Sequence, residues 1–528
     1  MPKETTAVRT RKLGEVTAYA IKRDIAELGW PVGEVLGNQS ELMQRYGVSR
    51  STLREAIRQI ERHGIARMRR GVRGGLVVEQ PARDSVVLSV ASYLELAAIG
   101  LPELFEAREV VENLLITLIC ERATDADVRG LRRTLDELLA APCDDVMLEA
   151  ARHLALRSAI SGLSRNVALG LLLEALYRVT SDMLTVESGH PDTVALIQES
   201  RREKRELVEA IAAGDEVQAH LALRSALLRS REQAEQQLRG MRKKFDTASA
   251  LTLSAAHLVK DGSGLMPKLG HRVSLKIAND IAGARLAPDS YLGTEPDMQV
   301  HYGVSRAVFR EAVRTLELHS IVRMRRGLGG GLVVGKPDPS YTVELTSIYL
   351  QYAKLKPRHF YELWRAIQIA AAQLAARRID EAGRVRLLGL LEAQAGAGRD
   401  EILALHGRVH EEISVLSGNR VLELFTRVMA EIGSYYPTEV PVQEVWKAFT
   451  ESHGQLIAAI TQGEVALARR LMTRHLKLVD AWYGDASRVA WVQSLAEAGD
   501  DTPPPAVKGK ARKPARKTGA AASGRKAR

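Results

Sequence analysis

The chain has 528 residues, of which 45% are hydrophobic, 26% charged and 5% aromatic. This length exceeds what one hydrophobic core supports, so we expect several globular domains, and abundant Ala, Leu, Arg and Glu favour helices. Two cysteines without CxxC spacing exclude a disulfide framework and a thiolate zinc site, and no apolar run approaches the roughly 18 residues of a membrane span, so we expect a cytoplasmic protein with no membrane partner.

The net charge of +11 is unevenly distributed along the chain. Nine positive side chains lie after Asp501, where no acidic residue follows, and the rest of the chain carries +2. The Pro, Lys, Ala and Gly composition of residues 501–528 predicts a disordered basic tail. Such a tail either adds sequence-independent DNA affinity or is a solubilising extension, so specific DNA binding has to be argued from local motifs.

The first eighty residues have the pattern of a winged helix-turn-helix domain, which we place at residues 11–80. Ser49 is a good N-cap for a helix with Leu53, Ile57 and Ile60 on its apolar face. A glycine-rich turn separates the two alternating strands that follow. The expected elements are helices Val16–Leu28, Ser40–Arg45 and Arg50–His63, and strands Ile65–Arg70 and Leu76–Glu79.

The chain then repeats itself. Residues 12–78 align with residues 268–334 without a gap at a constant offset of 256, and 31 of the 67 aligned positions are identical. This predicts a second winged helix-turn-helix domain at residues 267–337 and a tandem duplication of the whole unit. We call the two domains the first and second heads.

Amphipathic helical segments follow each head. We call them the first helical block, at residues 85–240, and the second helical block, at residues 341–487. Residues 241–266 are polar and are expected to form a linker. The predicted fold is therefore mostly α, with two winged helix-turn-helix domains that are each followed by an all-helical bundle.

Each head presents arginines and hydroxyls where a recognition helix meets base edges and phosphates. Ala307 and Val308 replace two hydroxyl residues in the second head, so we expect the heads to prefer different half-sites. A solvated basic face on an interaction-only domain is the alternative, and it is stronger for the second head. The candidate DNA-binding residues are Ser49, Arg50, Ser51, Thr52, Arg54, Arg69, Arg70 and Gly74 in the first head, and Ser305, Arg306, Arg310, Arg325, Arg326 and Gly330 in the second.

The string Tyr-Gly-Val-Ser-Arg-x-x-x-Arg-Glu-Ala, followed by an Arg-Arg-Gly and Gly-Gly wing, resembles the DNA-binding domain of GntR-type regulators. The helical blocks resemble the FCD effector domain of the FadR subfamily, so the resemblance covers most of residues 11–485 as two tandem copies. It implies a double-stranded DNA operator and a small-molecule effector, either a carboxylate or an acyl compound. The family usually carries Ser-Glu-Arg-Glu-Leu before the turn, whereas Ser40 and Pro296 replace its arginine here. The operator sequence therefore cannot be transferred.

Four histidines of the second helical block form a candidate metal site. His406 and His410 share one helix face, and His453 and His475 lie on later helices. They resemble the ligands of metal-binding FCD domains, which carry Asp-x3-His before a Ser-Gly-Asn turn, except that His406 replaces the Asp. This change favours zinc or a nickel-like ion over magnesium or calcium. Four unrelated histidines are the alternative.

The first helical block lacks this set, because Lys204 and Ala226 align with His453 and His475. Glu149 and His153 keep the i, i+4 spacing of the other pair but lie one residue farther from Ser161-Gly162 than that pair lies from Ser417-Gly418. We therefore predict no metal in the first block. It either binds an apolar or acyl ligand or only packs against its twin.

Arg108 lies where the resemblance implies that an effector carboxylate is held. An ion pair with Glu112, four residues further on, explains Arg108 equally well. In the second block Ile367 is expected in its place, and Arg365 is the candidate for binding an effector carboxylate.

Together these features predict a sequence-specific transcriptional regulator, a ligand-responsive repressor that acts as a covalent pseudo-dimer on an asymmetric operator. Further association of two chains stays open. A metal-dependent enzyme built on the four histidines is one alternative, but no Asp or Glu base stands beside them, so we predict no catalytic residue and no enzyme. A non-specific architectural DNA-binding protein dominated by the basic tail is the other.

Overall fold

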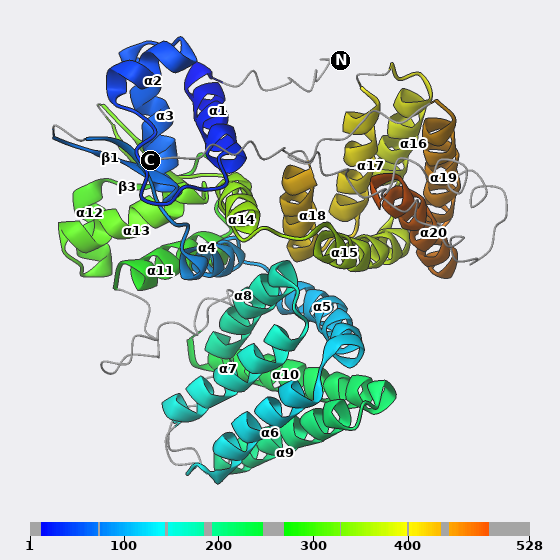
Figure 1. The fold of residues 1–528 in the computed structure, drawn as a ribbon. Coiled ribbons are helices and arrows are strands. Elements are labelled where there is room, and N and C mark those ends of the chain that lie inside the picture. The colour runs from blue at the N-terminus through cyan, green and yellow to red at the C-terminus, as the bar shows by residue number, and fades with distance from the viewer. Residues whose placement is uncertain are drawn as a thin grey trace, which may run out of the picture.

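The computed structural model describes residues 12–71, 74–142, 146–183, 193–245, 269–327, 329–398, 401–433 and 443–484. These residues form twenty helices and five short strands, arranged as two heads and two helical blocks (Figure 1), so the predicted fold class is confirmed. Within the described residues, no helix combines the length and the apolar character needed to cross a membrane. The basic tail and residues 246–268 of the linker region lie outside the described residues.

The first head consists of α1 (Leu13–Glu27), α2 (Gln39–Tyr46), α3 (Arg50–Arg62), β1 (Ala66–Arg69) and β2 (Gly75–Val78). The Ser49 hydroxyl accepts a hydrogen bond from the Thr52 amide and starts α3, as its N-cap position predicts. Between α2 and α3 the chain reverses at Gly47, whose φ of 62° lies in the left-handed region. The two strands form an antiparallel hairpin, the wing.

The second head repeats this arrangement with α11 (Leu269–Gly283), α12 (Glu295–Tyr302), α13 (Arg306–Leu318), β4 (Val322–Arg325) and β5 (Gly331–Val334). It adds a strand that the sequence did not predict, β3 (Tyr291–Gly293), which pairs with β5. At this place the first head has a single bridge between Val35 and Val77. Three residues are too few to show a period-2 pattern, which explains why the strand was missed.

The helical blocks each contain seven helices. In the first block, α10 continues five residues beyond the predicted domain end into the predicted linker. The helices of the first block are α4 (Arg83–Leu96), α5 (Leu101–Arg122), α6 (Asp125–Ala140), α7 (Val146–Leu163), α8 (Val167–Met183), α9 (Thr193–Ala212) and α10 (Glu216–Phe245). Those of the second are α14 (Ser340–Tyr352), α15 (Pro357–Arg378), α16 (Glu381–Ala395), α17 (Ile402–Leu416), α18 (Arg420–Gly433), α19 (Gln443–Thr461) and α20 (Val465–Gly484).

The first head packs on α14, a helix of the second unit (Figure 1). Ile348 of α14 is 2% exposed and belongs to the apolar core of the first head. The Tyr352 ring meets the Trp30 ring edge-on with 5.7 Å between centroids, and the Tyr341 ring stacks on His63 at 5.2 Å. The core of the first head is therefore completed by a helix from the other half of the chain.

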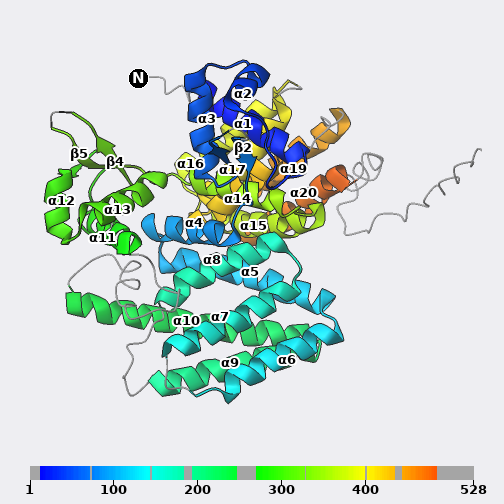
Figure 2. The ribbon, with the colours of Figure 1, turned by 60° about the vertical axis from the view of Figure 1, so that its left-hand side comes forward.

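The second head packs in the same way on α4 of the first unit (Figure 2). Leu96 of α4 lies in the apolar core of the second head. Glu95 is 3.4 Å from the His271 imidazole, and the Tyr93 ring lies 6.0 Å from that of His319. The connecting helices α4 and α14 also contact each other through the Ser89 and Thr342 hydroxyls, 3.1 Å apart. Each head is thus exchanged onto the connecting helix of the opposite unit.

The two helical blocks share one apolar core, and a repeated polar contact relates them by an approximate two-fold axis. The Asn166 amide donates to Glu362 across the interface at 3.1 Å, and Arg122 pairs with the same carboxylate. The equivalent contact in the other direction joins Asn419 and Arg378 of the second block to Glu106 of the first block. The interface between the two helical blocks is thus approximately symmetric in these contacts.

Because the first head packs on α14, we predict that shortening an apolar side chain of α14 destabilises the first head. Replacing Ile348 by Ala removes buried apolar volume and is expected to lower the free energy of unfolding by about 2–4 kcal/mol. In hydrogen–deuterium exchange, α1 and α3 should lose protection while α11 and α13 keep theirs. The control Leu388→Ala alters a side chain that is 43% exposed and should change neither. Loss of protection in the second head instead would contradict the exchange.

Candidate nucleic-acid interface and metal centre

In the first head, the predicted DNA-reading side chains stand at the N-terminal end of α3. Arg50, Ser51 and Arg54 are exposed, and among the described residues neither arginine forms an ion pair. The Ser49 hydroxyl is used locally, since it lies 2.9 Å from both the Ser51 and the Thr52 hydroxyl and caps the helix. Thr52 is half-buried. The side chains available to a ligand are therefore those of Arg50, Ser51 and Arg54.

The matching arginines of the second head are engaged by one carboxylate. Arg306 donates to Glu295 at 3.0 Å and Arg310 donates to it at 2.8 Å. These hydrogen bonds, first that from Arg310, lower the pKa of the Glu295 carboxyl, which is thereby kept ionised. At the repeat offset, the first head has Gln39 at the position of Glu295. The two reading helices, α3 and α13, thus differ in the charge of the neighbouring helix as well as in their own side chains.

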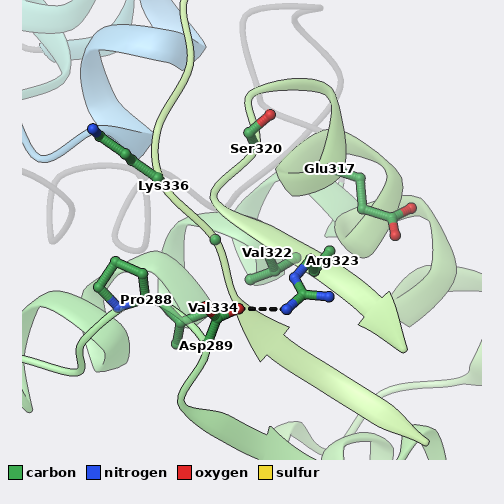
Figure 3. A pocket seen from close by; sticks show the side chains of 9 residues that line it. Pro288, Asp289, Glu317, Ser320, Val322, Arg323, Val334 and Lys336 are labelled. Carbon is green, nitrogen blue, oxygen red and sulfur yellow. Dashed lines mark hydrogen bonds and ion pairs between the residues drawn. The ribbon is translucent and has the colours of Figure 1, made fainter. Parts of the chain in front are cut away.

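Among the described residues, each wing has one arginine in an ion pair and two arginines that form none. At the base of each wing, the first arginine is paired, Arg67 with Glu79 and Arg323 with Asp289. The second of these pairs lies beside a shallow pocket of about 430 Å³ (Figure 3). The arginines nearer the wing tips, which were predicted to bind DNA, are all exposed: Arg69, Arg70, Arg325 and Arg326.

The backbone of each wing requires glycine at the two predicted wing positions. A Cβ on Gly74 would lie 2.4 Å from the Arg69 carbonyl oxygen, and one on Gly330 would lie 2.6 Å from the Arg325 carbonyl oxygen. A side chain at either position would therefore collide with the backbone of its own hairpin. These glycines shape the wing whether or not it touches a ligand.

A cleft of about 1260 Å³ lies between the first head and the second helical block. Ser51, Arg54 and Arg58 of α3 line one side of it. The facing helices α14, α17 and α18 contribute carboxylates and one cation, namely Glu344, Glu411, Glu431 and Arg427. The end of α3 that was predicted to read DNA is thus turned towards acidic side chains of the other unit. We call these three glutamates the acidic wall.

The four predicted histidines come together inside the second helical block. His406 and His410 lie on α17, His453 on α19 and His475 on α20, and one ring nitrogen from each lies within 4.8 Å of the others. The Nε2 atom of His475 is 3.2 Å from that of His410 and 3.1 Å from that of His453. Imidazoles from three helices therefore converge as the sequence predicts.

The surroundings of the cluster fix which nitrogens face its centre. Gln368 Oε1 lies 2.9 Å from Nδ1 of His410, and Gln394 Oε1 lies 2.8 Å from Nδ1 of His453. An amide oxygen only accepts, so both rings donate from Nδ1 and leave an Nε2 lone pair pointing inward. Facing lone pairs repel each other unless a proton or a cation lies between them. This orientation fits a metal ion.

Burial keeps these imidazoles neutral, as metal ligands must be. Desolvation lowers the pKa of His406 to about 4 and holds the pKa values of the other three well below the usual range. The Nδ1 atom of His406 is buried without a hydrogen-bond partner. Four neutral nitrogen donors suit zinc or a nickel-like ion better than an oxygen-preferring cation.

The predicted effector arginines are placed differently from each other. Arg108 is 3% exposed and donates to Glu112 at 2.7 Å, so the ion pair left open as an alternative is present, but in the interior instead of at the surface. Arg365 is an exposed residue of α15, and among the described residues no hydrogen bond joins it to the buried histidines. Because α5 and α15 match at the offset of 256, Trp364 and not Ile367 occupies the position of Arg108.

The structure also corrects the alignment of the two helical blocks. The amide of Asn166 donates to the Ser164 hydroxyl just as that of Asn419 donates to Ser417. Arg165 has the positive φ, 53°, that Gly418 has at 62°. The counterpart of Ser417-Gly418 is therefore Ser164-Arg165 and not Ser161-Gly162. At this offset of 253, the residues of the first block that correspond to His406 and His410 are His153 and Arg157.

Sequence reasoning missed the residues that position the predicted ones. Gln368 and Gln394 carry no recognisable spacing, because their contacts to the histidines join helices that are far apart in sequence. The role of Glu295 could have been noticed in the sequence. The repeat aligns this carboxylate with the neutral Gln39, while both heads keep the two arginines at the start of the next helix. No sequence pattern indicated the acidic wall.

Protein-family models match three parts of the chain. The model of bacterial regulatory proteins of the gntR family matches residues 13–76, and the FCD domain model matches residues 103–229 and 359–478. The chain therefore contains one region similar to the gntR DNA-binding domain and two regions similar to the FCD domain. The gntR model matches the first head and not the second, whose likeness to the first rests on the sequence repeat and on its fold.

Similar proteins carry the names of regulators. The Uxu operon regulator of Haemophilus influenzae is 30% identical over 168 residues, which are 31% of this chain and 59% of that protein. The HTH-type transcriptional regulator LutR of Bacillus subtilis is 25% identical over 199 residues, 36% of this chain and 87% of LutR. A solved structure, Streptococcus agalactiae GntR, aligns with 42% of this chain and 99% of its own, at 24% identity and a TM-score of 0.28. The family models and the names of these two relatives are those of transcriptional regulators, in agreement with the prediction that the chain is not an enzyme.

The histidine geometry predicts stabilisation by a transition metal. Zinc at 100 times its Kd should add about 2.7 kcal/mol to the free energy of unfolding of chelator-treated protein. The substitution His453→Ala should abolish this gain, whereas His301→Ala, which alters an exposed residue of the second head, should preserve it. Denaturant unfolding with and without zinc measures the effect. Equal stability of the wild-type protein in both conditions would rule out the site.

Proposed function

We propose that this GntR-family chain is a transcriptional regulator in which one polypeptide acts as a pseudo-dimer. In this proposal the chain arose by tandem duplication of a head and an FCD domain of the FadR subfamily, and its two heads bind a double-stranded DNA operator. The observation that carries the proposal is the exchange of heads across α4 and α14. An operator with two half-sites requires two heads at a fixed spacing. In this proposal one covalent chain supplies both the two heads and the core that sets their spacing.

The two heads would bind unequal half-sites. Arg50 and Arg54 are available to base edges or phosphates, whereas Arg306 and Arg310 have to leave Glu295 before they can bind. Ala307 and Val308 offer only apolar contacts to thymine methyl groups. The operator of this chain would therefore be asymmetric, with the stronger half-site under the first head.

Effector control would pass from the metal centre to the first head. Glu411 of the acidic wall directly follows His410 on α17, so a ligand that shifts α17 would also shift this one carboxylate of the wall. The wall faces the arginines of α3, and carboxylates compete with DNA phosphates for them. In the first block the matching positions are Leu88, Ser158 and Arg178, so these positions give the second head no matching carboxylates. We propose that the effector is a carboxylate or acyl compound and that the chain is a repressor.

The unequal heads give the sharpest test of DNA binding. Replacing Glu295 by Gln frees two arginines and is expected to raise affinity about tenfold, or ~1.4 kcal/mol, for a duplex that the wild-type chain selects from a random pool. The converse change Gln39→Glu should lower affinity by a similar factor, because it creates the same clamp in the first head. Fluorescence anisotropy at fixed salt measures both.

The control for these variants is Glu392→Gln, which removes an exposed carboxylate on α16, away from both reading helices. It should leave the affinity unchanged. If neither Glu295→Gln nor Gln39→Glu altered binding, the reading helices would not touch DNA. Weaker binding by Glu295→Gln would mean that Glu295 itself contacts a base.

A further inference from the structure

The two reading helices end close to the start of one connecting helix. A histidine caps the C-terminal end of each reading helix, His63 after α3 and His319 after α13. These two residues are buried, at 6% and 2% exposed. Tyr341 and Thr342, the second and third residues of α14, contact them. The C-terminal ends of both reading helices therefore meet at the N-terminal end of α14.

Tyr341 contacts both of these ends. Its hydroxyl donates to the carbonyl oxygen of Arg62, the last residue of α3, at 3.4 Å, and its ring stacks on that of His63. The same ring meets the His319 ring edge-on, with 6.0 Å between centroids and 74° between planes. Stacked and edge-on arrangements with centroids about 4.5–7 Å apart are the preferred geometries of aromatic pairs. One side chain thus joins the two heads.

The contacts continue from the second head to the other connecting helix, α4. The His319 ring lies 6.0 Å from that of Tyr93, and its Nδ1 atom is 3.4 Å from the Thr342 hydroxyl. The position of this imidazole is therefore fixed from α4 as well as from α14. From the first head to α4, the rings follow in the order His63, Tyr341, His319 and Tyr93.

The other unit has no tyrosine at the matching position. The connecting helices match at the offset of 256, since Ala98 and Lys354, just beyond their ends, both have a positive φ, of 50° and 52°. At this offset, the first unit has the exposed Ser85 in place of Tyr341. The fold thus accepts a small side chain at this position, and a single tyrosine serves both heads.

We propose that Tyr341 is a positioning residue that fixes the two reading helices relative to each other. A rotation of either helix about its C-terminal end would move one histidine away from the ring, so the ring can meet both histidines in only one arrangement of the heads. Chains of packed side chains carry such coupling between separate parts of a protein. The inference rests on the proposed function only where it concerns DNA, because fixed heads would make affinity depend on the spacing of the half-sites.

The first test needs no DNA. Spin labels at Gln44→Cys and Val300→Cys, exposed and matching positions of α2 and α12, report the distance between the heads when the two native cysteines are replaced by alanine. Double electron–electron resonance should give one narrow distance distribution with Tyr341 and a broader one with Tyr341→Ser or Tyr341→Leu. Tyr341→Phe, which keeps the ring, and the matched control Ser85→Ala should keep the narrow distribution. Unchanged width in Tyr341→Ser and Tyr341→Leu, or equal broadening in Tyr341→Phe or Ser85→Ala, would overturn the inference.

The second test measures how affinity depends on half-site spacing. One base pair inserted between the half-sites of the duplex that the wild-type chain selects moves them apart by about 3.4 Å and rotates them by about a tenth of a turn. The insertion should weaken binding of the wild type about tenfold and that of Tyr341→Ser only about threefold, because uncoupled heads can adapt to the new spacing. A variant that is merely less stable would lose affinity for both duplexes by the same factor, and this result would contradict the positioning role. If the wild type bound no duplex, the proposed function would fail, while the spin-label distances would still decide the inference.

Discussion

The packing of each head on the connecting helix of the opposite unit is the constraint on which the rest of the structure depends. Ile348 and Leu96 are core residues of heads to which they do not belong in sequence. Neither head could separate from the other unit without exposing its own core to water, at a cost of roughly 25 cal/mol for each Å² of apolar surface. The spacing of the heads is therefore set by α4, α14 and the shared core of the helical blocks.

Within this symmetric frame, the two units have acquired different charges. A carboxylate adds to the differences between the reading helices, because Glu295 binds Arg306 and Arg310 whereas the first head has the neutral Gln39 in its place. The helical blocks differ in a similar way, with imidazoles in one and buried cations in the other. The proposed duplication would make such divergence possible, since a change in one copy does not have to suit its twin, as it would in a homodimer.

Much of this could be predicted from the sequence, because the signals were local or periodic. The helices of the heads, the repeat at the offset of 256 and the four histidines all follow from spacing. The exchange of heads could not be predicted, because Ile348 and Tyr352 are ordinary apolar residues until their neighbours are known. The counterpart of the Ser-Gly-Asn turn was misplaced for a physical reason: Arg165 adopts a backbone conformation that favours glycine, so the expected Gly is absent from the motif.

We propose that one chain provides both heads for one operator. Native mass spectrometry of the chain bound to its shortest selected duplex tests this claim directly. The account predicts a complex of one chain and one duplex, with the free protein a single chain under the same conditions. A complex of two chains on that duplex, with no one-chain species at limiting protein, would contradict it.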